Sequence, residues 1–305
     1  MLRLKKILVC LDLTAMDENV IKYAGLMATT MQSESVVFMH INEPLDVPAS
    51  VRKNFPELYG APEGDFKDKM LNSVKQYFPG HANHNSEFVI NEGSPSQQIL
   101  RWPGMNDVDL IIMGKKSHLK GKGVNPSKIA NVSHCSVLFV PEKCEISIDK
   151  LFVPIDFSLR SKTAIDQALE IRRNGKSEIT LQHVYYVPQG YHYTGKTYEE
   201  FTTIMRENSE KAYFQFLKQN GYDASAFKDV YTLDDDDAPA DKIYLEALRQ
   251  NANLIILASR GRTKAASLLL GSVALELIKY DQRIPYMVIK DKRENMSFFA
   301  ALMKV

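Results

Sequence analysis

At 305 residues the chain is long enough for about two domains of ordinary size. Hydrophobic residues at 45% and charged residues at 25% are typical of a soluble globular protein. The formal net charge of +1 gives no overall attraction to nucleic acid or to a membrane surface, and no apolar run is long enough to span a bilayer, so we expect neither as a partner.

Strands and helices are predicted to alternate along the first half of the chain. Apolar runs predict strands over residues 6–11, 35–41, 86–91, 109–113 and 137–140. Apolar residues at helical spacing predict helices over residues 17–30 and 65–78, and a further helix opens at 96–102. Residues 42–64 are Pro-rich and irregular, with a short helix expected near 51–55.

The second half follows the same order. Strands are predicted over residues 151–155, 179–184, 226–233, 254–258 and 285–289. Helices are predicted over residues 159–173, 198–219, 241–250 and 273–280, and Ser158 is a candidate N-cap for the first of them. Residues 185–197 are rich in Tyr and Gly, which is typical of a lid or of a surface for a partner.

Four landmarks recur in the same order at a nearly constant spacing. Ile7–Asp12 matches Leu151–Asp156, and Asp109–Gly114 matches Asn253–Ala258, each at a separation of 144 residues. Two further pairs match residues 91–95 with 235–239 and residues 36–40 with 179–183. The chain is therefore a tandem duplication. We predict one domain over residues 1–143, a second over residues 149–291, and a C-terminal tail over residues 292–305.

Strands that alternate with helices form parallel units with right-handed crossovers, which predicts an α/β fold for each half. In such sheets a ligand binds beyond the carboxyl ends of the strands. The landmarks there are the acid after strand one, Asp12 or Asp156, and the residue that ends strand four, Gly114 or Ala258. If these strands are neighbours, the acid faces the loop after strand four and can accept hydrogen bonds from both hydroxyls of a ribose.

The loop after the fourth strand of the second half has the composition of a phosphate site. Leu254–Ala258 is followed by Gly261, and Gly271-Ser272 opens the next helix. Glycine lets a ligand approach the backbone closely, and a Gly-Ser pair at a helix start offers N–H groups and a hydroxyl to an anion. The alternative is a strand-to-helix turn that binds no ligand. Features elsewhere in the sequence are needed to choose between a phosphate site and such a turn.

The spacing of these residues resembles the G-x2-G-x9-G-[S/T] nucleotide loop of the universal stress protein family, with Ala258 in the place of the first glycine. Val153–Ser158, Asp107–Gly114 and Cys135–Pro141 also resemble stretches of this family. The resemblance covers nearly the whole chain. It implies two tandem domains, each a five-stranded parallel sheet in the order 3-2-1-4-5 with helices on both faces, which is a Rossmann-like, adenine nucleotide alpha hydrolase-like fold.

The resemblance also implies a ligand, which is ATP, with ADP or AMP as alternatives and with Mg²⁺ accompanying ATP. ATP-binding members place adenosine against strand one and the phosphates on the glycine loop. Carried over to this sequence, Asp156 would hold the ribose. The other site residues would be Pro154 and Val184 at the adenine, Ala258 at the ribose–phosphate junction, and Gly261, Gly271 and Ser272 at the phosphates. Arg262 and Val273 are further nucleotide-binding residues that the resemblance implies.

The first half carries a poorer copy of the loop. Gly114 is present, but Lys115-Lys116-Ser117 follows without a second glycine, and Ser127 stands where the second half has Gly271. We therefore expect a degenerate, mainly structural site, marked by Asp12, Gly114 and Ser127. The loop lysines are either phosphate contacts or solvated side chains.

No pattern of catalytic or metal-binding residues stands out, so we predict neither. His40 and His183 occupy matching ends of strand two, which is typical of structural or pocket-lining histidines. The acidic run at residues 234–237 is typical of a solvated loop before a helix. The three cysteines are too few for a disulfide framework and predict a reducing, cytoplasmic setting.

Strand five of each half, at residues 137–140 and 285–289, is expected at a sheet edge, where apolar residues invite pairing. The resemblance implies that family dimers join through this strand. The two halves are therefore expected to pair with each other, and a homodimer to which the tail contributes is the further option.

Three functions fit the sequence. The favoured one is an ATP-binding stress-response regulator with its site in the second half. The alternatives are a nucleotide-free scaffold that acts through protein–protein interaction and a slow ATPase.

Overall fold

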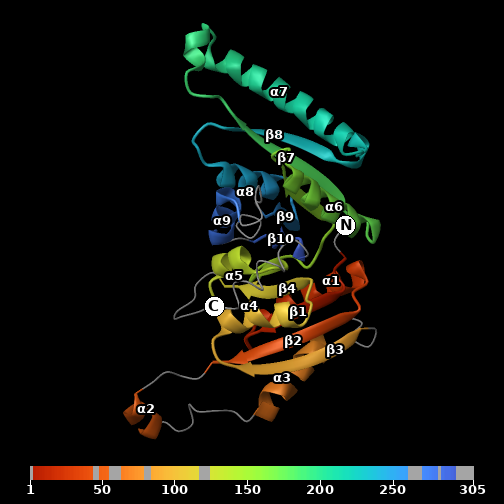
Figure 1. The fold of residues 1–305 in the computed structure, drawn as a ribbon, viewed down its shortest axis with the longest axis vertical. Helices are drawn as coiled ribbons and strands as arrows, with labels where there is room; N and C mark the ends of the chain where they lie inside the picture. The colour runs from red at the N-terminus through yellow and green to blue at the C-terminus, as the bar shows by residue number, and fades with distance from the viewer. Residues whose placement is uncertain are drawn as a thin grey trace. The chain divides into compact units, whose positions relative to one another are not determined.

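The structure is a computed structural model that describes residues 3–43, 48–54, 63–78, 84–116, 124–259, 270–280 and 283–292. The chain divides into two compact units (Figure 1). The first-repeat unit is built on residues 2–146 and also takes in the segment that begins at Lys290. The second-repeat unit is built on residues 147–280 and 284–289.

The first-repeat unit is a parallel sheet with the strand order β3-β2-β1-β4-β5. Its strands are β1 (Lys6–Leu11), β2 (Ser35–Asn42), β3 (Asn85–Glu92), β4 (Leu110–Lys115) and β5 (Ser136–Pro141). Its helices are α1 (Met16–Met31), α2 (Ala49–Asn54), α3 (Glu63–Tyr77), α4 (Pro95–Met105) and α5 (Pro126–Val132).

The second-repeat unit repeats this plan with the strand order β8-β7-β6-β9-β10. Its strands are β6 (Lys150–Pro154), β7 (Glu178–Tyr186), β8 (Lys228–Asp234), β9 (Leu254–Ala258) and β10 (Tyr286–Ile289). Its helices are α6 (Leu159–Arg173), α7 (Tyr198–Gln219), α8 (Pro239–Arg249) and α9 (Ser272–Lys279), with short 3-10 turns η3 (Tyr191–Thr194) and η4 (Ala224–Ala226). The predicted order 3-2-1-4-5 is confirmed in both units.

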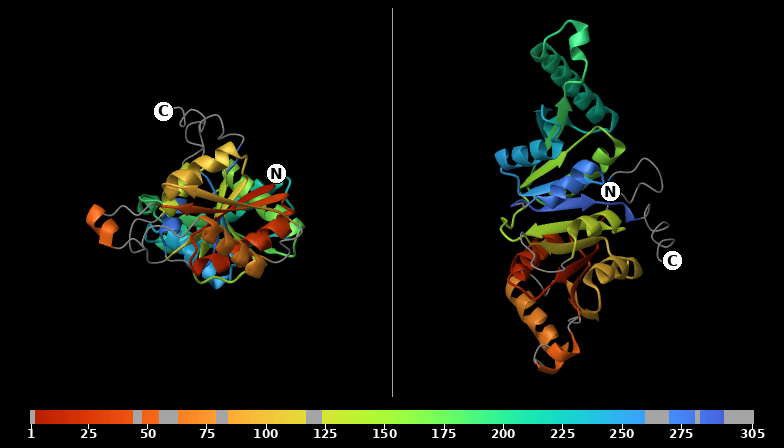
Figure 2. Two further views of the ribbon diagram at one scale, coloured as in Figure 1. Left: turned by 90° about the horizontal axis from the view of Figure 1, so that it is seen from below. Right: turned by 90° about the vertical axis from the view of Figure 1, so that its left-hand side faces the viewer.

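Helices cover both faces of each sheet, as the sequence predicted. In the right-hand view of Figure 2, α1 and α4 flank opposite faces of the first sheet, and α6 and α8 flank opposite faces of the second. The central strands are therefore buried on both sides, which explains their continuous apolar runs. Leu110–Ile112 in β4 and Leu254–Ile256 in β9 are at most 1% exposed.

Two elements run further than their sequence pattern indicates. The sequence predicts that a helix opens over residues 96–102, and α4 continues past Pro103 to Met105. A proline lacks only its own N–H, and within the last turn that loss removes a single backbone bond. Strand β7 continues through Tyr185 to Tyr186, because β8 pairs with it along this length.

No helix within the described ranges is both long and apolar enough to cross a membrane. Helix α7 has the length, but charged residues occur along it from Glu199 to Lys218.

The start of α6 fixes the turn that follows β6. Ser158 is the N-cap residue, and its Oγ accepts hydrogen bonds from the N–H groups of Arg160 (3.2 Å) and Ser161 (3.4 Å). The predicted cap is confirmed. It satisfies donors that have no partner inside the helix.

Replacing this cap is expected to destabilise the second-repeat unit. Ser158→Ala removes the acceptor and should lower the free energy of unfolding by about 1 kcal/mol. Urea unfolding followed by circular dichroism measures the change. Ser158→Asp is the matched control, because aspartate retains an N-cap oxygen. Equal stability of the Ala variant and the wild type would contradict the assigned cap.

Candidate functional site

Strands one and four are neighbours in the second-repeat unit, which was the condition for a site. Strand β6 pairs in parallel with β9 through Leu151 opposite Leu254 and Phe152 opposite Ile255. The carboxyl ends of these strands therefore lie at the same edge of the sheet. Asp156 follows β6, and Ala258 ends β9.

One carboxylate oxygen of Asp156 accepts hydrogen bonds from the protein, and the other accepts none from the described residues. Its Oδ1 accepts hydrogen bonds from the Ser161 hydroxyl (2.7 Å) and the Ser158 N–H (3.0 Å). No described residue donates to Oδ2. Burial acts to raise the pKa of Asp156, but the bonds from Ser158 and Ser161 outweigh it and lower the pKa. The group is therefore an ionised, exposed acceptor at neutral pH.

His183 of β7 stabilises the turn that contains Asp156. The Nδ1–H of His183 donates to the carbonyl of Ile155 at 3.0 Å, and its ring lies 4.3 Å from the ring of Phe157. Phe157 has a φ of +58°, a left-handed conformation that this packing holds in place. Burial lowers the pKa of His183, so the ring is neutral at pH 7. This geometry fits the structural role predicted for the histidine.

The helix that follows the candidate loop begins without a side-chain cap. Gly271 is the N-cap of α9, with an extended backbone and no side chain to accept the first N–H groups. Ser272 is exposed and Val273 is half-buried in the first turn. These N–H groups and the helix dipole favour an anion.

The remaining predicted site residues lie on the strands or outside the described part of the chain. Pro154 ends β6, opposite Gln182, and Val184 lies in β7, opposite Thr232. Both are half-buried. Gly261 and Arg262 fall outside the described residues, so the structure places neither.

The sequence profile of the Universal stress protein family matches the chain twice, over residues 3–141 and 147–289. The chain belongs to the universal stress protein family. It carries two copies of the family's domain in tandem, in agreement with the internal repeat.

Solved structures show the same fold over nearly the whole chain. One, assigned to the universal stress proteins, comes from Pseudomonas aeruginosa UCBPP-PA14, with 15% sequence identity, a TM-score of 0.63, and coverage of 99% of this chain and 98% of that chain. A universal stress protein from Archaeoglobus fulgidus DSM 4304 has 16% identity and a TM-score of 0.58, with coverage of 93% and 96%. No curated protein matches the chain.

In the first copy of the universal stress protein domain, the acid equivalent to Asp156 is Asp12, and both of its carboxylate oxygens have partners in the chain. Oδ1 of Asp12 accepts from the hydroxyl (2.6 Å) and N–H (3.1 Å) of Thr14, and Oδ2 pairs with Lys116 Nζ at 2.6 Å. Burial raises the pKa of Asp12, and the bonds from Lys116 and Thr14 bring it below the ordinary value. Both oxygens are thus engaged by the chain itself.

Sequence reasoning missed this role of Lys116. Its two interpretations were a phosphate contact and a solvated side chain, whereas the ammonium pairs with the acid of its own repeat. The available signal was positional, because Lys116 follows β4, the neighbour of β1, by one residue.

The helix start of the first repeat is also occupied. Asn125 is the N-cap of α5, and its Oδ1 accepts from the N–H of Lys128 at 3.1 Å. Ser127, predicted as part of a degenerate site, is half-buried in the first turn. The first repeat therefore fills with its own side chains two positions at which the described residues of the second repeat place none.

Gly114, near the end of the fourth strand of the first repeat, faces the helix that packs on that strand. An added Cβ at Gly114 would meet the Met16 side chain of α1 at 2.7 Å and Val20 at 3.4 Å. These positions correspond to Arg160 and Ala164 in α6. By this equivalence the methyl group of Ala258 would face α6, where Ala164 is smaller than Val20 but Arg160 is longer than Met16.

The acidic run after β8 is held by the protein itself. Asp234 accepts the N–H of Ala238 at 2.9 Å, and Lys242 Nζ pairs with Asp235 (2.6 Å) and Asp236 (3.2 Å). Among the residues described, no group of His, Cys, Asp or Glu side chains is placed to hold a metal ion.

Gly114→Ala is expected to destabilise the first-repeat unit by about 1–3 kcal/mol, because the added methyl group forces Met16 out of its packed position. Denaturant unfolding measures the change. The matched control, Ala258→Gly, removes a methyl group at the equivalent position and should cost at most about 1 kcal/mol. A neutral Gly114→Ala would show that the side chain at this position does not face the helix.

Proposed function

We propose that this universal stress protein is a stress-response regulator that binds ATP in its second repeat. The observation that carries the proposal is the open Oδ2 of Asp156 at the carboxyl end of β6, beside the end of β9. An ionised carboxylate with one oxygen available suits the two hydroxyls of a ribose. ADP and AMP are alternative ligands, and Mg²⁺ would accompany the phosphates of ATP.

The other predicted site residues would contact the phosphates and the adenine. The uncapped start of α9, with Gly271, Ser272 and Val273, supplies N–H groups and a hydroxyl for the phosphates. Gly261 and Arg262 join them on the grounds of the sequence motif alone. Pro154 and Val184 would lie against the adenine, and Ala258 at the ribose–phosphate junction.

The first repeat supports the proposal as an internal contrast. There, Lys116 pairs with Asp12, the acid that corresponds to Asp156, and Asn125 caps the helix start. We therefore expect one nucleotide per chain, bound in the second repeat.

A scaffold that acts through protein–protein contacts is the second candidate. Large apolar side chains of the second-repeat unit are exposed, with Tyr186 at 63%, Tyr193 at 87% and Phe214 at 53%. Such residues are enriched at protein interfaces. Pairing of the domains through their last strands, a homodimer and a cytoplasmic setting remain predictions of the sequence.

The first experiment identifies the ligand directly. Protein purified without added nucleotide is denatured, and the released small molecules are identified by chromatography and mass spectrometry. Titration with ATP and Mg²⁺ then gives the affinity and the stoichiometry. Neither release nor binding at millimolar ATP would rule out the nucleotide site and favour the scaffold.

Asp156→Asn is expected to weaken ATP binding about ten- to a hundredfold, because the substitution replaces the open acceptor oxygen with an amide and removes the charge. The matched control is Asp12→Asn, the same change at the equivalent residue, which should leave the affinity unaltered. Gly271→Val, which crowds the helix start, should also abolish tight binding. Equal effects of the two Asp→Asn changes would contradict the assignment of the site to the second repeat.

A further inference from the structure

A buried glutamine of β7 has an amide oxygen without a hydrogen-bond donor. Gln182 is 0% exposed. Its Nε2 donates to the hydroxyl of Thr232 at 2.9 Å and to the carbonyl of Lys242 at 3.2 Å. Its Oε1 is also buried, and it accepts no hydrogen bond within the described part of the chain. Such an acceptor carries the full cost of leaving water, so its missing donor calls for an explanation.

The bond to Lys242 determines which end of the Gln182 amide is open. A backbone carbonyl only accepts hydrogen bonds, so the group that meets it has to be the NH2 rather than the oxygen. The hydroxyl of Thr232 can donate or accept, and here it accepts. Turning the amide over would place two acceptors against each other at Lys242. Oε1 is therefore the atom that needs a donor.

Gln182 stands on the same sheet face as the two residues assigned to the adenine. It lies opposite Pro154 in the parallel pair of β6 and β7, and side chains paired in this way point to the same face. Val184, two residues further along β7, shares that face. The ring of His183 lies on the other face, against Phe157. Pro154 and Val184 are therefore the neighbours of Gln182 on this face.

The helices on this face place Gln182 on the side of the candidate phosphate position. The carbonyl of Lys242 belongs to α8, so α8 covers Gln182. Helix α8 packs against α9 (Figure 1), whose uncapped start is the candidate phosphate position. A nucleotide with its phosphates at α9 and its base on Pro154 and Val184 would bring an edge of the base to Oε1.

The first repeat has an apolar residue in the place of Gln182. Met39 occupies the equivalent position of β2, at the 143-residue separation that also relates His40 to His183, and it is likewise 0% exposed. An apolar side chain is thus sufficient for the packing of this strand and leaves no acceptor unpaired. The polar amide of Gln182 occurs in the repeat whose acid keeps one oxygen open, and it is more than the fold requires.

We propose that Gln182 is a specificity-determining residue of the second-repeat site and selects adenine through its 6-amino group. This inference rests on the proposed function and names the feature of the base that the site recognises. The amino group of adenine is a donor and matches the open Oε1, whereas the 6-oxo group of guanine is an acceptor and would repel it. Because Oε1 is already buried and unpaired in the free protein, the new bond costs no further desolvation of this atom.

The test compares ATP with the triphosphate of purine riboside, which lacks only the amino group, in titrations of the full chain. The wild type is expected to bind ATP about tenfold or more tightly than this analogue. Gln182→Met, which copies Met39, should reduce the ratio to within about twofold, because the acceptor is gone. A loss of stability alone would weaken both ligands alike and leave the ratio unchanged. Gln215→Met, the same substitution at an exposed position of α7, should keep the wild-type ratio.

The outcomes separate this inference from the proposed function. Equal affinity of the wild type for the two nucleotides would support a nucleotide site and overturn the role of Gln182. An unchanged ratio in Gln182→Met would overturn that role as well, and a buried water would then be the partner of Oε1. Binding of neither nucleotide at millimolar concentration would overturn both proposals. The wild-type comparison needs no substitution, so it stays decisive if Gln182→Met does not fold.

Discussion

Parallel pairing between the first and fourth strands of each repeat is the constraint on which the candidate site depends. Because β6 lies beside β9, the acid that ends one strand and the loop that follows the other reach the same edge of the sheet. The same pairing of β1 with β4 brings Lys116 to Asp12. One backbone arrangement therefore gives an open acceptor in one repeat and a closed ion pair in the other, and side chains alone decide between them.

The turn after the first strand is conserved in geometry between the repeats although its residues differ. Leu13 and Phe157 both have a φ near +60°, and in each unit a histidine of the second strand donates to the carbonyl two residues earlier. The two repeats therefore share the backbone of this turn, and in the first repeat both oxygens of the acid are bound by the chain itself.

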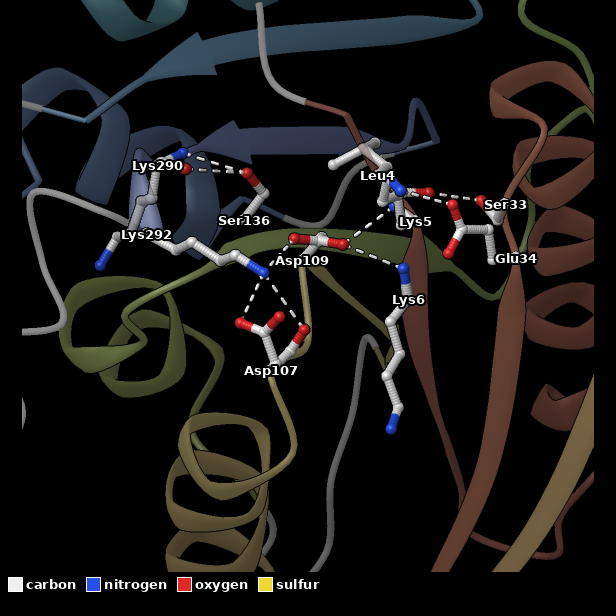
Figure 3. A network of polar contacts seen from close by, with 10 residues as sticks. All are labelled: Leu4, Lys5, Lys6, Ser33, Glu34, Asp107, Asp109, Ser136, Lys290 and Lys292. Carbon is white, nitrogen blue, oxygen red and sulfur yellow. Dashed lines mark hydrogen bonds and ion pairs between the residues drawn. The ribbon is translucent and has the colours of Figure 1, made fainter.

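The sequence alone predicted the fold well because its signals are local and repeated. Apolar runs identified β4 and β9, helical spacing identified α6 and α7, and the 144-residue separation fixed the duplication. It did not predict the pairing of Lys116 with Asp12, since the position of Lys116 after β4 brings it near the acid but the pairing itself depends on side-chain conformation. The contacts of Lys292 with Asp107 and Asp109 (Figure 3) were missed for the same reason, because they join residues more than 180 positions apart.

The packing of Met16 against Gly114 has a consequence for how a glycine motif should be interpreted. A glycine that makes room for a helix side chain is tied to the size of that side chain, and it becomes replaceable once the neighbour shrinks. The residue at the end of the fourth strand is therefore constrained by the packing of a helix on the sheet as well as by any ligand beyond it.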